Sequence, residues 1–331
     1  MAGRRRKKSG GRSYAWRYRG RIVACVFVEV IIICALVIMI GWNKGVKEWF
    51  EQFEQPVLKE VDISGINSPN AILMQARGGK ILGEINGEAQ IYPASMTKIM
   101  TVILGIENFD DLDEKITLTN EMFTGLYEQD ATQAGFQPGE EVRVIDLLYG
   151  AMLPSGAECC IALADTISGS EADFAELMNK KARKLGMENT NFCDSTGLHN
   201  PDHYSTVKDI AVLMKYCIKN DTFREIVETS RHSTGVTNIH PDGITYYSTM
   251  FKNLSDPTVT GGKILGGKTG YTSEAGHCLV SFAEIEGREY IFVSAGASGA
   301  DGNTIPHIQD AVTVYNRVGA AIEEKMNDNN K

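Results

Sequence analysis

The sequence predicts an α+β protein: one antiparallel sheet with helices packed on it, preceded by a single transmembrane helix. Strand-like patterns lie near both ends of the expected folded part and enclose a helical middle, which is typical of a sheet assembled from both ends of the chain. A long apolar segment follows a basic N-terminus. Neither an internal repeat nor a Pro- or Ser-rich linker follows residue 70, so one domain is expected there. With 331 residues, 43% of them hydrophobic, the chain is not a disordered one.

The N-terminus is strongly basic and leads into an apolar segment. Residues 1–21 contain nine of the 33 Lys and Arg residues and none of the 42 acids. Residues 22–42 carry one charge, Glu29, and about 20 apolar residues rising ~1.5 Å each span the ~30 Å core of a bilayer. A signal peptide has a shorter apolar region, of about 7–15 residues, and a small-residue cleavage site. We therefore predict an uncleaved membrane anchor, and we prefer this to a nucleic-acid-binding tail.

The charge distribution also predicts an orientation. Lys and Arg residues beside a membrane span stay in the cytoplasm, so the tail (1–21) is expected inside the cell membrane and everything after residue 42 outside. We expect residues 43–64 to form an amphipathic juxtamembrane stalk, and residues 65–326 to form the folded outer domain. Five cysteines lie in the outer part, an odd number that cannot all pair: Cys159, Cys160, Cys193, Cys217 and Cys278. Buried thiols are expected, with one disulfide left open.

The local patterns place the elements in order. Residues 71–76 and 80–85 predict a hairpin, whose turn contains Gly78 and Gly79 to supply a positive φ. Apolar residues recurring at helical spacing predict five helices, over residues 95–107, 144–153, 159–167, 173–185 and 207–219. The remaining segments predict three strands and a closing helix, over residues 265–269, 278–284, 290–295 and 308–326.

The first chemical motif is Ser95-Met96-Thr97-Lys98. Residues three apart share one face of a helix, so Lys98 can reach the Ser95 hydroxyl. A serine becomes a nucleophile when a base takes its proton, and a lysine becomes such a base when burial lowers its pKa. The Ser-x-x-Lys spacing alone is weak evidence for a catalytic pair, since it recurs at Ser205 and Lys208, which we interpret as the start of a helix.

The second motif is Lys268-Thr269-Gly270, on a predicted strand. A lysine and a threonine hydroxyl can bind a carboxylate, and the glycine lets a substrate backbone approach. Residues 262–269 also match the nucleotide-binding pattern GxxxxGK[ST], but the helix that must follow it is missing, as is a strand ending in Asp to hold Mg²⁺. A third string, Ser155-Gly156-Ala157, supplies either a proton-relaying serine or an ordinary polar loop.

The histidines give little sign of a metal site. His199 and His203 have the i, i+4 spacing of a zinc-binding HExxH helix, but the glutamate is absent and Pro201 lies between them. We therefore expect no metal.

In their order and spacing, the three motifs resemble the penicillin-recognising serine acyl enzymes. The chain is identified as similar to the D-alanyl-D-alanine carboxypeptidase family, over most of residues 70–300. The likeness includes the segments 92–98, 135–139, 146–148, 152–157, 185–187, 196–198 and 267–272. It implies the β-lactamase/penicillin-binding transpeptidase-like fold: a five-stranded antiparallel sheet flanked by helices, joined to a helical subdomain, with the site between them.

The resemblance also implies roles. Ser95 would attack the carbonyl between two D-alanines of a peptidoglycan stem peptide, with Lys98 as base and Ser155 assisting proton transfer. Lys268 and Thr269 would hold the terminal carboxylate, and the N–H groups of Ser95 and Tyr271, beside Gly270, would form the oxyanion hole. Water would release the shortened peptide, and β-lactams would acylate Ser95 as inhibitors. No cofactor and no nucleic acid are implied.

Two departures from the family pattern keep alternatives open. Ala157 stands where the family usually has Asn, and residues 289–316 contain no Arg or Lys to bind a substrate carboxylate. One alternative is a catalytically weak homologue that binds wall peptides. Another is a β-lactamase-like hydrolase, although the Glu-x-x-Leu-Asn segment that would supply a deacylating carboxylate is absent.

Overall fold

The computed structural model describes residues 58–254, 256–299 and 305–329, which belong to one compact unit, Val57–Lys331. The expected basic tail (1–21), the expected anchor (22–42) and most of the expected stalk (43–64) lie outside the described residues. Within the described part, no helix combines the length and the apolar character needed to cross a membrane.

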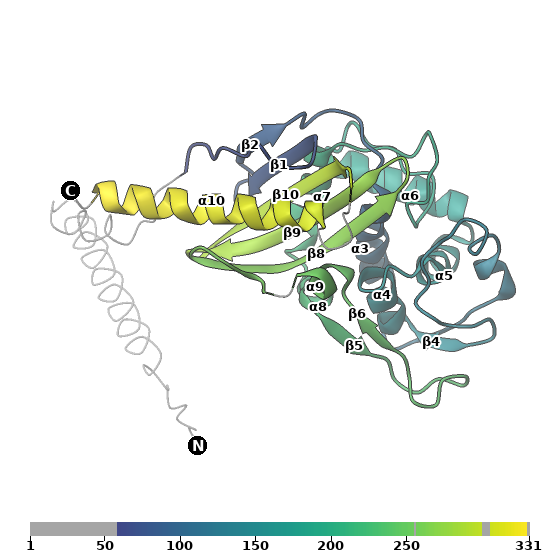
Figure 1. Ribbon diagram of the computed structural model, residues 1–331. Helices are drawn as coiled ribbons and strands as arrows, with labels where there is room; N and C mark the ends of the chain where they lie inside the picture. The colour runs from purple at the N-terminus through teal and green to yellow at the C-terminus, as the bar shows by residue number, and fades with distance from the viewer. Residues whose placement is uncertain (1–57, 255, 300–304, 330–331) are drawn as a thin grey trace, which may run out of the picture. The chain divides into compact units, whose positions relative to one another are not determined.

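A six-stranded antiparallel sheet forms the centre of the unit, in the order β2-β1-β10-β9-β8-β7 (Figure 1). Its strands are β1 (Asn70–Gln75), β2 (Ile81–Ile85), β7 (Thr258–Val259), β8 (Gly262–Thr272), β9 (Gly276–Ile285) and β10 (Arg288–Ala297). The first strand pairs with the last, from Asn70 opposite Ala295 to Gln75 opposite Tyr290. The prediction of a sheet assembled from both ends of the chain is therefore confirmed.

The predicted number of five strands is wrong by one. The additional strand, β7, is two residues long and pairs with the start of β8, with Thr258 opposite Lys263. The chain reverses between the two strands at Gly261, whose φ is +73°. A two-residue strand is too short to show an alternating pattern, so the sequence carries no signal for it.

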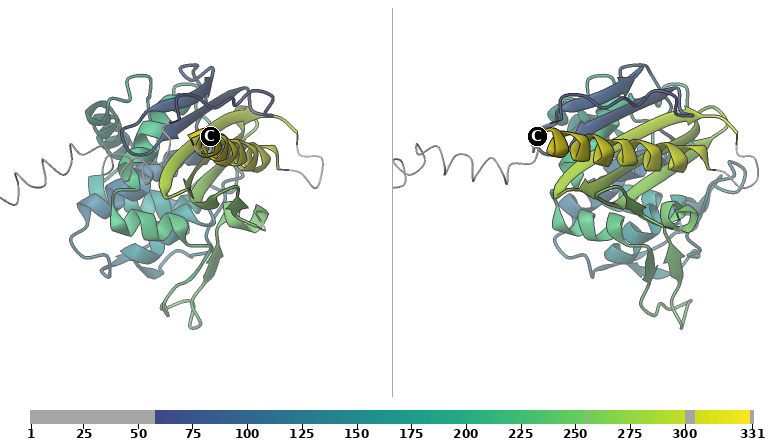
Figure 2. Two further views of the ribbon diagram at one scale, coloured as in Figure 1. Left: turned by 90° about the vertical axis from the view of Figure 1, so that its left-hand side faces the viewer. Right: turned by 60° about the vertical axis from the view of Figure 1, so that its left-hand side comes forward.

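The sheet separates two apolar cores. Alternate residues of a strand face opposite sides, and in β9 the two sets are Cys278, Val280 and Phe282 on one side and Leu279, Ala283 and Ile285 on the other. The second set packs against α10 (Pro306–Asn329), through Val314, Tyr315 and Val318. Figure 2 shows α10 on one face of the sheet and the other long helices on the opposite face.

The helical part lies between β2 and β7 in the sequence. Its helices are η1 (Ala94–Thr97), α3 (Lys98–Asn108), η2 (Asn120–Phe123), α4 (Val144–Met152), α5 (Ala157–Ser168), α6 (Glu171–Leu185), α7 (Val207–Cys217), α8 (Asp221–Glu228) and α9 (Thr249–Asn253). Two small sheets accompany them, β3 (Lys115–Thr117) with β4 (Glu141–Arg143) and β5 (Arg231–Ser233) with β6 (Thr245–Tyr247). All five predicted helices of the middle region are present.

Helix starts follow the local sequence, with one difference. The Thr206 side chain accepts a hydrogen bond from the Asp209 N–H at 3.0 Å, which confirms that the second Ser-x-x-Lys string begins a helix. The helix predicted to start at Ser95 instead begins with the 3₁₀ turn η1 and becomes α-helical at Lys98. The chain enters that turn through Ala94, whose φ of +47° lies in the left-handed region.

The segment before β1 packs onto α10. The core beneath this helix includes Leu58, Val61 and Ile63, which lie within the expected stalk (43–64). Asp310 is also buried, and its carboxylate accepts four hydrogen bonds: from the backbone and side chain of Asn67, at 2.8 and 2.7 Å, and of Ser68, at 2.9 and 2.6 Å. One charged side chain therefore ties the start of the unit to its last helix.

We expect Asp310→Ala to destabilise the protein, because it leaves the buried donors of Ser68 without acceptors. Each unsatisfied buried group costs about 1–3 kcal/mol, so the free energy of unfolding should fall by about 3 kcal/mol. At ~2–4 °C per kcal/mol, calorimetry should find a melting temperature lower by roughly 6–12 °C. The control is Asp110→Ala, at an exposed position. Equal melting temperatures for the two variants would contradict this account of Asp310.

Candidate active site

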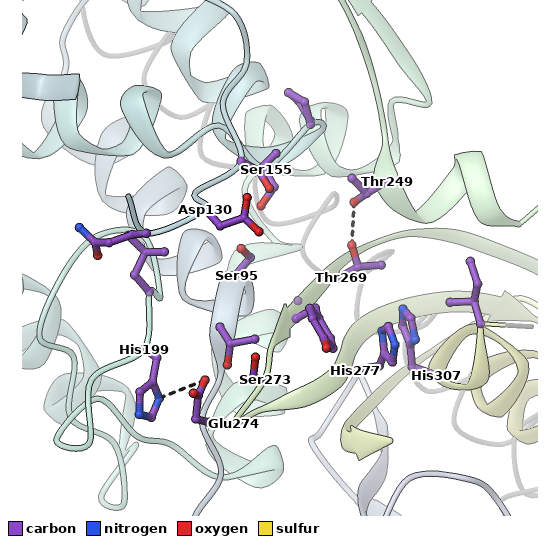
Figure 3. A pocket seen from close by; sticks show the side chains of 18 of the residues that line it. Ser95, Asp130, Ser155, His199, Thr249, Thr269, Ser273, Glu274, His277 and His307 are labelled. Atoms are coloured by element: carbon purple, nitrogen blue, oxygen red, sulfur yellow. Dashed lines mark hydrogen bonds and ion pairs between the residues drawn. The ribbon is translucent and has the colours of Figure 1, made fainter. Parts of the chain in front are cut away.

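A cavity of about 830 Å³ lies where the edge of β8 meets the helical part. Figure 3 shows that the hydroxyl groups of Ser95 and Ser155 point into it from two separate segments. Its lining also includes Asp130 from the loop after η2, Thr249 from α9, residues 269–274 from β8 and the turn after it, and His307 from α10. Side chains far apart in the sequence thus meet in one space.

The first serine–lysine pair joins η1 to α3. Lys98 Nζ lies 3.0 Å from Ser95 Oγ and donates a hydrogen bond to the Thr196 carbonyl at 2.7 Å. The lysine side chain is buried, and burial lowers the pKa of its amine below the usual range. A lysine with a lowered pKa is more readily neutral, so Lys98 is suited to take a proton from Ser95.

The loop before α7 holds the carbonyl that positions Lys98. Asp194 Oδ1 accepts hydrogen bonds from the N–H groups of Thr196 and Gly197, both at 2.7 Å. Burial alone would raise the pKa of Asp194, but the hydrogen bond from His203 and its charge, with the Thr196 donors, lower it to about 2. The other nitrogen of the His203 ring lies 2.9 Å from Thr97 Oγ1, next to Lys98 in the chain.

Gly197 makes this arrangement possible. Its φ is +79°, and a Cβ atom there would lie 1.9 Å from the Ala94 carbonyl oxygen. No other residue type could bring this loop so close to η1.

The second serine–lysine pair joins the loop before α5 to β8. Lys268 Nζ donates to Ser155 Oγ at 3.0 Å and to the Thr269 carbonyl at 2.8 Å. Burial, together with the charge of Lys98, lowers the pKa of Lys268 well below its usual value. Ser155 has a φ of +73°, a conformation that costs free energy in a residue other than glycine. The fold therefore holds this hydroxyl against a backbone preference.

β8 supplies the remaining predicted residues. Thr269 Oγ1 lies 2.7 Å from Thr249 Oγ1, as the dashed line in Figure 3 marks, and Tyr271 is exposed at the cavity. A Cβ atom on Gly270 would lie 3.0 Å from the Ser95 backbone nitrogen and 3.1 Å from Ala94 Cβ. Gly270 is thus required for the close approach of β8 to the nucleophile.

The structure brings all seven predicted site residues to one place. Ser95, Ser155, Thr269, Gly270 and Tyr271 line the cavity, and the buried Lys98 and Lys268 each contact one of the two serines. Ala157, at the position of the family asparagine, is buried at the start of α5. The neighbouring Glu158 is also buried, accepts hydrogen bonds from the N–H groups of Ala134 and Gly135, and has a pKa raised by burial.

The competing motifs do not assemble. The nucleotide-binding pattern at 262–269 lies within the extended strand β8, so its backbone does not form a loop around phosphates. His203 is buried against Asp194, whereas His199 lies at the cavity with its Nδ1 3.9 Å from Glu274 Oε2. No group of three or more His, Cys, Asp or Glu side chains that could hold a metal ion is found among the described residues.

Several residues of the site carry no sequence signal. Asp194, Thr249, His277 and His307 belong to none of the three motifs, and only folding brings them to the site. The segment 196–198 could be noticed as a family-like string, but its carbonyl contact with Lys98 has no local pattern.

Comparisons with known proteins agree with the geometry. The family model for D-alanyl-D-alanine carboxypeptidases matches residues 57–299. The D-alanyl-D-alanine carboxypeptidase DacF of Bacillus subtilis is 35% identical over 233 residues, which cover 69% of this chain and 57% of DacF. DacC of Escherichia coli is 33% identical over 262 residues, or 72% of this chain and 58% of DacC. The chain therefore spans less than two thirds of either relative.

A solved structure matches the fold over its whole length. The Streptomyces K15 DD-transpeptidase superposes with a TM-score of 0.69 at 29% identity, covering 79% of this chain and 100% of the other. The penicillin-binding type of fold that the sequence predicts is therefore confirmed for the described part of the chain.

We expect Gly270→Ala to slow the reaction of Ser95 with acylating reagents by roughly a hundredfold, the effect of losing one oxyanion donor. The added methyl group would press on the Ser95 backbone nitrogen, and β8 would have to move away. Stopped-flow measurement of the acylation rate checks this. Gly235→Ala is the control, because a Cβ atom there meets nothing closer than 3.7 Å. Equal rates for the two variants would refute the role of the close approach.

Proposed function

The chain belongs to the D-alanyl-D-alanine carboxypeptidase family, and on this premise we propose that it removes the terminal D-alanine from peptidoglycan stem peptides ending in D-Ala-D-Ala. The observation that carries the proposal is the Ser95–Lys98 pair, at 3.0 Å, facing a cavity that a second serine–lysine pair also borders. A nucleophile, a buried base and a second hydroxyl together suit acyl transfer.

In the acylation step, the neutral Lys98 amine takes the Ser95 proton while Ser95 Oγ attacks the carbonyl between the two D-alanines. The N–H groups of Ser95 and Tyr271 stabilise the negative oxygen that forms, a contribution of roughly 3–4 kcal/mol per donor. The side-chain hydroxyl of Thr269 donates to the terminal carboxylate, and Lys268 holds Ser155 and the Thr269 carbonyl beside it. The close approach of Gly270 to the Ser95 backbone nitrogen supports this arrangement.

The C–N bond then breaks, and the departing D-alanine needs a proton on its nitrogen. Ser155 donates its proton to this nitrogen and receives a replacement from the protonated Lys98. The proton taken from Ser95 thus leaves with the amine. Water next attacks the Ser95 ester and gives a proton to Lys98, which passes it to the Ser95 oxygen as the C–O bond breaks, and the shortened peptide is released. A β-lactam would acylate Ser95 in the same way, and its ring nitrogen would stay attached to the acyl group.

We also propose that residues 22–42 anchor the protein in the cell membrane, with residues 1–21 in the cytoplasm and the catalytic domain on the cell-wall side. The nine basic residues before the apolar segment support this orientation. Alkaline phosphatase, which folds only outside the cytoplasm, should be active when fused after residue 64 and inactive when fused after residue 21. Activity of the second fusion alone would reverse the proposed orientation.

Two alternative functions are each favoured by one observation. The match to the Streptomyces K15 DD-transpeptidase along its whole length favours an acyl-enzyme that an amine, and not only water, can resolve. The buried Ala157, which has no side-chain amide to bond to Lys98 or the substrate, favours a catalytically weak protein that binds wall peptides.

The test incubates the full chain and its Ser95→Ala variant with diacetyl-L-Lys-D-Ala-D-Ala and with a fluorescent penicillin. We expect D-alanine release and labelling by the native chain, and neither by the variant, because the variant lacks the Ser95 hydroxyl that forms the ester. A parallel reaction with glycine as acceptor measures transfer to an amine. Labelling without release would favour the peptide-binding alternative, and the absence of both would refute the proposed function.

A further inference from the structure

The cavity lining contains unusually few groups that could attract a carboxylate. Among the described residues that line it there is no Lys or Arg, whereas Asp130 and Glu274 are present. Lys268 lies outside this lining and donates to Ser155 and to a backbone carbonyl. The lining groups able to become positively charged are three histidines, and one of them, His199, faces Glu274.

The other two, His277 and His307, form a stacked pair beside the catalytic strand. Their ring centroids are 5.0 Å apart and the rings are 6° from parallel. Figure 3 shows the two rings side by side. His277 lies directly opposite Tyr271 in the β8–β9 register, and the two rings are 4.7 Å apart. Since alternate residues share a face of a strand, Thr269, Tyr271 and His277 project to the same side of the sheet.

His307 has an unused polar atom. Its side chain is 97% buried, given a residue exposure of 3%, and its Nδ1 has no hydrogen-bond partner within the described part of the chain. Buried polar atoms are almost always paired, and because His307 is among the residues that line the cavity, this nitrogen is a candidate partner for a ligand bound there. His307 also lies in the first turn of the 24-residue helix α10, where the helix field favours an anion.

We propose that His277 and His307 bind the terminal carboxylate of the substrate, next to Thr269, and that the pair takes up a proton when it does so. The inference rests on the proposed function, since it assigns the carboxylate of the D-Ala-D-Ala peptide to these residues. Each imidazole donates an N–H to the carboxylate, which in turn stabilises the protonated ring.

The surroundings keep the pair neutral until the carboxylate arrives. Burial and the neighbouring His277 lower the pKa of His307 to about 4, against a smaller opposite effect of Asp310. Burial also lowers the pKa of His277. Within residues 58–254, 256–299 and 305–329, the other titratable groups around the pair are Tyr271 on β8, Glu274 in the turn between β8 and β9, and Asp310 on α10, whose carboxylate is engaged by Asn67 and Ser68.

A bound carboxylate raises the pKa of the pair, so binding and protonation favour each other. Affinity for a carboxylate-ended peptide should therefore rise as the pH falls from 8 to 6. The same peptide with its C-terminal carboxylate methylated should show no such rise. The ionisation of Lys98 affects both substrates equally, so the ratio of their kcat/KM values isolates the histidine contribution.

The experiment measures this ratio between pH 6 and 8 on the full chain in detergent. For the native protein we expect the ratio of acid to methyl ester to increase severalfold toward pH 6, up to about tenfold per pH unit for one linked proton. In His277→Gln and in the His277→Gln/His307→Gln double variant, the ratio should become independent of pH. The KM of the acid should rise roughly tenfold to a hundredfold, with a smaller change in kcat. His199→Gln is the matched control and should keep the native pH dependence of the ratio.

A binding measurement separates this proposal from the proposed function. Calorimetric titration of the Ser95→Ala chain with diacetyl-L-Lys-D-Ala-D-Ala, in buffers of different ionisation enthalpy, gives the protons taken up on binding. We expect uptake that disappears when His277→Gln is added. Loss of uptake in this variant, together with a native chain that releases no D-alanine, would support the carboxylate site while refuting the carboxypeptidase function. A ratio independent of pH in the native protein, equal proton uptake with and without His277, or no binding of the peptide would each overturn the histidine assignment.

Discussion

Two lysine side chains are buried at the meeting point of the sheet and the helices, and among the described residues they donate only to uncharged oxygens. Lys98 contacts Ser95 and the Thr196 carbonyl, and Lys268 contacts Ser155 and the Thr269 carbonyl. Withdrawing an ammonium group from water is costly, and no carboxylate of the described residues is hydrogen-bonded to either amine, although the charges of Asp194 and Glu158 partly offset the cost for Lys98. The rest of the fold has to supply this free energy through the two apolar cores on either side of the sheet. Burial lowers the pKa of both amines, which favours the proton transfers of the proposed acyl transfer.

The partners of these lysines are fixed mainly by backbone geometry. The loop at Thr196 is held by Asp194 and approaches η1 through Gly197, and β8 approaches the same turn through Gly270. Both glycines face main-chain atoms, which cannot give way as a flexible side chain can. The site therefore depends on how closely three pieces of main chain meet, and less on the reach of long side chains. Ser155 shows the same dependence on backbone geometry, because its backbone φ of +73° costs free energy in a residue other than glycine.

Sequence patterns predicted the parts of the fold that repeat locally. The sheet from both ends, the helical middle and the Gly78–Gly79 turn follow from alternation, helical spacing and glycine chemistry, and all are present. The family resemblance placed the seven site residues, which the structure brings together, while their individual chemical roles stay predictions, as do the anchor and its orientation. The two-residue strand β7, the 3₁₀ turn at Ser95 and the Asp194–His203 contact could not be predicted. The strand is too short for an alternating pattern, the 3₁₀ turn differs from an α-helix only in its hydrogen-bond spacing, and the Asp194–His203 contact joins two residues outside helices and strands, so none of them leaves a periodic trace in the chain.

The pairing of β1 with β10 has a consequence for how the protein folds. Asn70 and Ala295 are 225 residues apart in sequence yet lie opposite each other in the sheet. Closing so long a loop must precede the contacts that stabilise it, which makes folding slow. During synthesis, the first hairpin has no partner until almost the entire domain has left the ribosome, and the apolar face of its strands stays open throughout. The growing chain therefore exposes an unpaired edge of β1, where another chain could pair, until β10 becomes available.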